Sequence, residues 1–115
     1  MSDPNYKWFK VAASEEELIF PENGILELEV GGKTVCLGRF NGKLFAFAQK
    51  CPHAGGYFCK GWIDALGNVV CPLHRYKFNM ETGRNVTGEG YYLKRWPVEL
   101  REDGVWVARE KGFFF

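Results

Sequence analysis

Two cysteine–histidine pairs are the residues of this sequence best suited to chemistry. The first pair is Cys51 and His53 in the segment CPHAGG, and the second is Cys71 and His74 in CPLHRYKFNMETG. Seventeen residues separate His53 from Cys71, so two loops that lie side by side could bring two thiolates and two imidazoles together. Zinc and iron–sulfur clusters both accept this set of donors in tetrahedral geometry.

The distribution of the donors over the two segments favours one of these alternatives. Zinc sites of the finger type usually take a cysteine pair from one loop and a histidine pair from another. Here each segment offers one cysteine and one histidine, which lets one iron take both cysteines and a second iron take both histidines. A two-iron cluster is therefore favoured, and a structural zinc site is the alternative.

At these motifs the sequence closely resembles the Rieske family, whose signature is Cys-x-His, a spacer of similar length, and Cys-x-x-His. The resemblance covers nearly the whole chain and includes the flanking segments FNGKLFAF and YLKRWPVEL. It implies one 2Fe–2S cluster, with Cys51 and Cys71 on one iron and His53 and His74 on the redox-active iron. Two neutral imidazoles in place of two thiolates raise the reduction potential above that of an all-cysteine cluster.

Three positions depart from the high-potential members of that family. Leu73 stands where respiratory Rieske proteins have a disulfide cysteine, and Tyr76 and Phe78 stand where they have serine and tyrosine hydroxyl donors. Because fewer donors then stabilise the reduced cluster, we expect a potential in the lower half of the range of roughly −150 to +300 mV. The glycine-rich stretch 87–90 replaces the proline-containing loop that shields the cluster in the family.

The resemblance implies an electron carrier rather than an enzyme. The chain has two histidines, and a cluster would use both, so an oxygenase iron site of two histidines and a carboxylate cannot be assembled. Similar small ferredoxins pass single electrons from a flavin-dependent reductase to a terminal oxygenase, and we expect such partners here. A small subunit of a multisubunit reductase, such as nitrite reductase, is an alternative function; a structural zinc-binding module is another.

Composition limits the size and the surroundings of the protein. The 115 residues, 46% of them hydrophobic, suffice for one domain over 1–115 with its own core. A net charge of +1 provides no global attraction to nucleic acid or to an anionic membrane. Charged residues interrupt the first twenty positions, so these form neither a signal peptide nor a membrane span. We expect a cytoplasmic protein, in which Cys36 and Cys59 are structural thiols.

The elements that must position the ligands are predicted to be strands. Alternating residues over 26–30, the turn Gly31-Gly32 and a partner strand over 34–39 form one hairpin. Asn41-Gly42 is a second turn signal, before a strand over 44–47.

A further hairpin is predicted from the stretch 93–100 to 105–107 through the turn Asp103-Gly104, and a strand over 8–11 opens the fold. Ser14 and Glu17 fit a capping box for a helix of a turn or two. The expected class is all-β, a Rieske-type antiparallel β-sandwich or barrel. Two loops in an insert over about 49–78 would form its small cluster-binding subdomain.

The remaining chemistry-bearing residues lie near the ligands or among aromatic positions. Four basic residues could form a rim that docks an acidic partner: Lys50, Lys60, Arg75 and Lys77. Tyr91, Tyr92 and Trp96 are expected in the core or on a sheet surface, and Phe113–Phe115 are expected to pack back on the domain.

Overall fold

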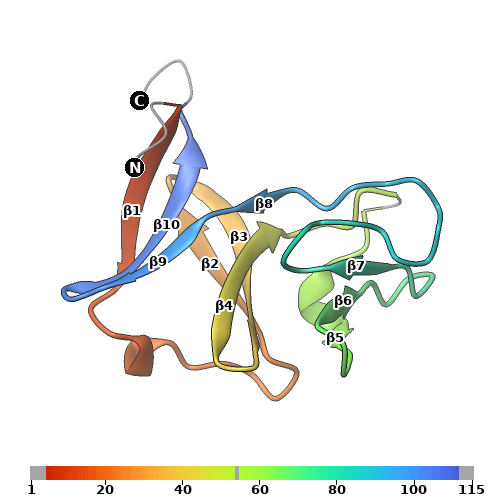
Figure 1. Cartoon of the computed structure of the whole chain (residues 1–115), viewed down its shortest axis with the longest axis horizontal. Coiled ribbons are helices and arrows are strands. Elements are labelled where there is room, and N and C mark those ends of the chain that lie inside the picture. Colours follow the sequence, from red (N-terminus) through yellow and green to blue (C-terminus); the bar gives the residue numbers. More distant parts are fainter. Residues whose placement is uncertain (1–4, 54, 112–115) are drawn as a thin grey trace.

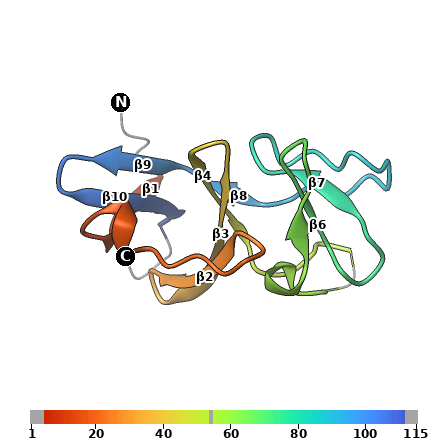
Figure 2. The same cartoon turned by 90° about the horizontal axis from the view of Figure 1, so that it is seen from below.

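The computed structural model describes residues 5–53 and 55–111. Within those ranges, the strands form three antiparallel sheets, and the only helical segments are two single 3₁₀ turns, η1 (Glu15–Glu17) and η2 (Phe58–Lys60). The predicted all-β class is therefore confirmed. The sheets follow one another along the long axis of the molecule (Figures 1 and 2). Among the described residues, no helix is long and apolar enough to cross a membrane.

The first sheet has the strand order β1-β10-β9 and contains the predicted opening strand. Its members are β1 (Tyr6–Ala12), β9 (Val98–Arg101) and β10 (Gly104–Glu110). Arg101 pairs with Gly104, so the β9–β10 turn consists of Glu102 and Asp103, one residue earlier than the sequence predicts.

The second sheet has the order β2-β3-β4-β8. It contains the following strands: β2 (Ile25–Val30), β3 (Lys33–Phe40), β4 (Lys43–Ala48) and β8 (Arg95–Trp96). Both predicted turns are confirmed, because Gly31 and Gly32 have φ of 62° and 83°, and Asn41 and Gly42 have φ of 51° and 73°. Two successive positive φ values are typical of the turn that closes a two-residue hairpin.

The stretch 93–100 is not one strand, as the sequence predicts, but two that belong to different sheets. Trp96 in β8 pairs with Ala46, whereas Val98 in β9 pairs with Val107. Pro97 stands between them and has no N–H to continue a ladder. The chain therefore crosses from one sheet to the other between β8 and β9 (Figure 1).

The insert contains a third sheet in addition to the expected loops. Its strands are β5 (Trp62–Ile63), β6 (Asn68–Val70) and β7 (Lys77–Asn79). Strands of two or three residues are too short to show alternating apolar and polar positions, and all three residues of β6 are buried. The sequence pattern therefore does not predict these three strands. Isolated bridges from Phe78 to Asn85 and from Arg84 to Tyr92 attach the next segment, so the subdomain extends beyond residue 78.

Two hydrophobic clusters form the core, one in the scaffold and one beneath the insert. The scaffold cluster includes the fully buried Leu37 and Val107. In the other cluster, the ring of Phe58 meets the rings of Phe47 and Phe78 edge-on, at centroid distances of 5.7 and 5.9 Å. Phe58 thus joins β4 of the scaffold to β7 of the insert, and this packing holds the insert in place.

Candidate metal centre

The first ligand loop is a tight turn closed by main-chain hydrogen bonds. The Cys51 N–H donates to the Gly56 carbonyl at 2.7 Å, and the Gly55 N–H donates to the Cys51 carbonyl at 3.0 Å. A bridge between Lys50 and Tyr57 fixes the base of this loop. Gly55 has φ of 74°, a left-handed conformation that glycine adopts without steric cost.

The second ligand loop repeats the turn with different residues. The Cys71 N–H donates to the Tyr76 carbonyl at 2.9 Å, and the Arg75 N–H donates to the Cys71 carbonyl at 2.9 Å. The pair Val70–Lys77 closes its base in the β6–β7 hairpin. Arg75 has φ of 60°, which is uncommon for a residue with a Cβ. Arg75 is held in this conformation because the second loop is closed by the same pattern of two main-chain hydrogen bonds as the first.

The two turns place their thiols inside and their imidazoles outside. Cys51 and Cys71 are buried, His53 is half-buried and His74 is exposed. Cys51 Sγ lies 3.2 Å from His53 Nδ1, and ligand atoms of Cys51, His53 and Cys71 all lie within 4.8 Å of one another. His53 Nε2 lies 2.7 Å from His74 Nδ1. The structure thus gathers three of the four predicted ligands and brings the fourth into contact with His53.

Gly56 packs closely against the second ligand loop. A Cβ added at Gly56 would come within 2.9 Å of Cys71 Sγ and 3.1 Å of Leu73 Cβ. Any side chain at this position would therefore push against the thiol. Two thiols with two imidazoles are the donor set of a His₂Cys₂ 2Fe–2S centre, so the residues present fit that cofactor.

The other two cysteines differ from the ligand pair in their surroundings. Burial and the charge of Glu27 raise the pKa of the Cys36 thiol to about 12. Burial and a hydrogen bond with Glu27 also raise the pKa of Cys59. Thiolates rather than thiols bind metals, so both residues are poorly suited as ligands. All four cysteines, each within the described residues, are free of disulfides.

Two tyrosines lie beside His53: Tyr76, which the sequence places at the position of a hydroxyl donor, and Tyr91, which it does not place near the cluster. The Tyr76 ring centroid is 4.0 Å from that of His53, and the Tyr91 centroid is 5.8 Å from His53 and 6.2 Å from Tyr76. Tyr91 is 39% exposed and lies outside the strands, so it belongs to neither the core nor a sheet surface, and the prediction for it is wrong. Tyr92 is 70% exposed and forms a bridge with Arg84, which agrees with a surface position beside paired backbone. Trp96 is buried as predicted.

Two of the four residues of the predicted basic rim make local contacts, and the other two are exposed. Lys77 Nζ lies 3.6 Å from Asp64 Oδ2, and Lys50 Nζ lies over the Tyr57 ring at 5.5 Å from its centroid. Lys60 and Arg75 are exposed. Because an ion pair offsets the charge of Lys77, the rim is less basic than its four residues suggest, and docking of an acidic partner remains a prediction.

Comparison with known proteins identifies the class of this fold and site. The sequence profile of the Rieske [2Fe-2S] domain matches residues 7–96, and the chain therefore belongs to the Rieske domain family. The predicted cofactor, one 2Fe–2S cluster, is confirmed at the level of the family. The Phe113–Phe115 tail lies outside the described residues.

Three proteins illustrate what the chain is similar to. It is 43% identical over 92 residues to apoptosis-inducing factor 3 of Mus musculus, covering 78% of this chain but about 15% of that protein's length. It is 28% identical to the ferredoxin component of the naphthalene 1,2-dioxygenase system of Pseudomonas aeruginosa, covering 88% of this chain and 94% of that one. A ferredoxin–oxygenase complex of carbazole 1,9a-dioxygenase matches with a TM-score of 0.75 and 26% identity, covering 92% and 96%.

Proposed function

We propose that this domain carries single electrons on a 2Fe–2S cluster and is not itself a catalyst. Cys51 and Cys71 would hold one iron, and His53 and His74 would hold the other. The paired turns carry this proposal, because they bury both thiols and leave both imidazoles nearer to solvent. An electron can then enter and leave through the histidine side without passing through the scaffold.

The donor we propose is a flavin-dependent reductase and the acceptor a terminal oxygenase. The supporting observation is the similarity to a ferredoxin component of a dioxygenase system over 94% of that protein's length. A cytoplasmic location belongs to the same proposal. Because the chain spans about 15% of the apoptosis-inducing factor 3 proteins it matches, their whole activity is not carried over.

The first experiment tests the cluster and its ligands. The purified protein should be red-brown and, once reduced, should show the anisotropic paramagnetic resonance signal of low average g that a His-ligated two-iron centre gives. Cys51→Ser should abolish this signal, whereas Cys59→Ser should retain it, because Cys59 lies outside the ligand loops. A colourless, silent protein containing zinc would overturn the proposed function and leave the fold intact.

The second experiment tests the partners. The reduced protein should be reoxidised by an oxygenase and re-reduced by a flavin reductase encoded beside its gene, each followed by the visible absorbance of the cluster. If the protein instead co-purifies in a fixed complex with a larger reductase, the alternative of a reductase subunit holds.

A further inference from the structure

The scaffold side chain of Asn23 bonds directly to the main chain of the insert. Asn23 lies in the turn before β2. Its Nδ2 donates to the carbonyls of Cys59 at 2.8 Å and of Gly61 at 3.1 Å. Its Oδ1 accepts from the N–H of Ile25 at 3.2 Å. Both donors and the acceptor of the amide therefore have partners.

The two carbonyls lie at the end of the helical turn η2. The last carbonyls of a helix have no partner within it, and here Asn23 supplies the donors. Both partners of Nδ2 are acceptors and the partner of Oδ1 is an N–H group, so the contacts define the orientation of the amide. Because Gly61 is buried, loss of these donors would leave a carbonyl without a partner away from water.

On one side, the segment that Asn23 holds continues from the first ligand loop. The bridge between Lys50 and Tyr57 closes that loop, and η2 begins at the next residue, Phe58. The Phe58 N–H donates to the Gln49 carbonyl at 3.0 Å. A shift of η2 would therefore shift the end of the first loop.

On the other side, the segment packs against the second ligand loop. A Cβ added at Gly61 would collide with the Val70 carbonyl oxygen and would lie 3.2 Å from Pro72 Cδ. Val70 and Pro72 flank the ligand Cys71 in the sequence. Because glycine has no Cβ, η2 can end directly against the main chain of the second loop.

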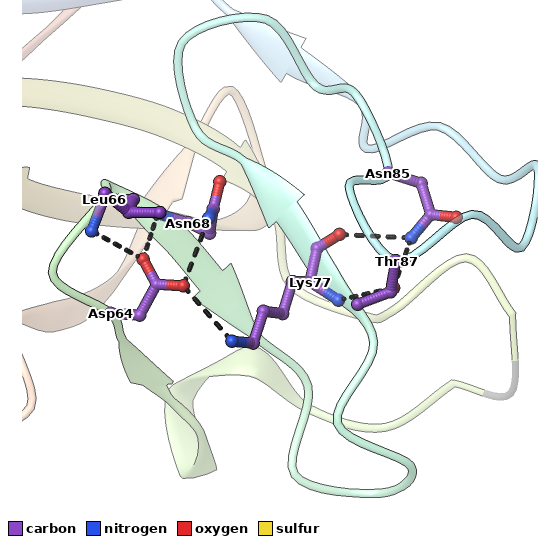
Figure 3. Close-up of polar contacts among 6 residues, drawn as sticks. All are labelled: Asp64, Leu66, Asn68, Lys77, Asn85 and Thr87. Carbon is purple, nitrogen blue, oxygen red and sulfur yellow. Dashed lines mark hydrogen bonds and ion pairs between the residues drawn. The ribbon is translucent and has the colours of Figure 1, made fainter.

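Asp64 connects the remaining strands of the insert to the same segment. It follows β5, and its carboxylate accepts from the N–H groups of Leu66 at 2.9 Å and of Asn68 at 3.0 Å. The carboxylate also pairs with the ammonium of Lys77 in β7, the strand that follows the second ligand loop. Figure 3 shows these contacts around Asp64. The end of β5, the turn before β6 and β7 are therefore fixed to one another.

We propose that Asn23 is a positioning residue for the 2Fe–2S cluster, which fixes the two ligand loops relative to each other from outside both. This inference rests on the proposed function, because it concerns how the ligands of the cluster are held. Each loop supplies one cysteine and one histidine, so the cluster stays bound only while the loops keep their spacing. Without the Asn23 amide, η2 loses its hydrogen bonds to the scaffold, and the spacing of the loops varies.

Two substitutions of Asn23 in the cluster-containing protein test this role. Asn23→Ala removes all three hydrogen bonds. Asn23→Ser keeps an oxygen that can accept from the Ile25 N–H within the turn, but it is too short to reach the insert, and it carries the test if Asn23→Ala does not fold. Both variants should shorten the lifetime of the cluster absorbance in air severalfold. Both should also broaden the paramagnetic resonance signal of the reduced cluster, because the ligand geometry then differs between molecules.

Leu37→Ala is the control for a general loss of stability. Leu37 is 0% exposed and belongs to the hydrophobic cluster of the scaffold, so its truncation lowers the free energy of unfolding. This variant should retain the lifetime and the line width of the wild type. If Leu37→Ala shortens the lifetime as much as Asn23→Ala does, the lifetime follows global stability, and the positioning role is overturned.

Hydrogen exchange provides a readout that does not depend on the cluster. The Gly61 N–H donates to the Phe58 carbonyl at 2.9 Å, and it should exchange severalfold faster in Asn23→Ala than in the wild type. The amide of Val35, in the central strand β3, should not change. An unchanged exchange rate at Gly61, or an unchanged cluster lifetime, in Asn23→Ala would overturn the positioning role and leave the electron-carrier proposal standing. A wild type without any cluster signal would instead overturn the proposed function.

Discussion

At the scale of single residues, the site combines groups of opposite character. The thiols of Cys51 and Cys71 are buried, and the imidazole of His74 is exposed. The surroundings of the two thiols are apolar. Phe78, for example, is 0% exposed and belongs to the same core cluster as both cysteines. The hydroxyl donors that raise the potential in respiratory relatives have no counterpart at Phe78.

The reduction potential follows from that lack of a donor. We expect a midpoint below roughly +75 mV, the middle of the range of Rieske centres, because phenylalanine cannot donate a hydrogen bond to sulfur in the reduced cluster. A redox titration followed by paramagnetic resonance or circular dichroism measures it. A midpoint well above that value would show that another group, such as the Tyr76 hydroxyl, supplies the missing stabilisation.

At the scale of elements, the two ligand turns are the same structure built from different sequences. Both are closed by the same pair of main-chain hydrogen bonds, and both begin directly after a bridged residue, Lys50 or Val70. The left-handed residue is Gly55 in one turn and Arg75 in the other. The hydrogen-bond pattern rather than the residue type therefore defines the turn.

Gly56→Ala tests the space between the two turns. The added methyl group would come within 2.9 Å of Cys71 Sγ, so the variant should bind less iron per chain than the wild type while its far-ultraviolet circular dichroism is unchanged. Iron content and the cluster absorbance measure the loading. Full loading with an unchanged cluster lifetime would show that Leu73 or the second turn moves aside at little cost.

At the scale of the whole molecule, the core consists of two hydrophobic clusters, and Phe58 lies in the one beneath the site. The rings of Phe47 and Phe78 contact Phe58 from β4 and β7. Leu37 belongs to the other cluster, in the scaffold. A substitution in the hydrophobic cluster beneath the site should therefore affect the 2Fe–2S cluster, whereas one in the scaffold cluster should not.

Phe58→Ala and Leu37→Ala form a matched pair for that difference. Both side chains are 0% exposed, so we expect losses of about 3–5 kcal/mol for Phe58→Ala and about 2–5 kcal/mol for Leu37→Ala. Only Phe58→Ala should also shorten the cluster lifetime. Denaturant unfolding and the decay of the cluster absorbance measure the two effects. Equal lifetimes of the 2Fe–2S cluster in both variants would contradict this difference between the two hydrophobic clusters.

Stability in acid should depend on Glu110 at the end of β10. Burial tends to raise the pKa of this carboxyl group, but hydrogen bonds from Lys94 and Trp96 outweigh it and lower the pKa to about 2. A lowered pKa stabilises the fold above the unfolded value of about 4.5, and this contribution is lost as the pH falls toward 2.

Because the Glu110 side chain is 40% exposed, solvent screening limits the contribution to at most about 1 kcal/mol. The free energy of unfolding of the wild type should fall between roughly pH 5 and pH 2, and it should fall less in Glu110→Gln. Urea denaturation at these two pH values measures the difference. Glu102→Gln, in the exposed β9–β10 turn, is the control. Identical pH profiles for Glu110→Gln and wild type would contradict the assignment.

The sequence by itself determined the all-β class and two of the turns, and it predicted the two ligand pairs. These features depend on local chemistry: the spacing of Cys51, His53, Cys71 and His74, the period of two, and the positive φ values at 31–32 and 41–42. Each can be deduced from a few neighbouring residues.

Only the tertiary structure decided which distant residues surround the ligands. Tyr91 lies beside His53 because the Arg84–Tyr92 bridge turns its segment back toward the insert. The strands at 95–101 divide because their partners belong to different sheets. No local pattern encodes such contacts, since they depend on where the chain returns in space.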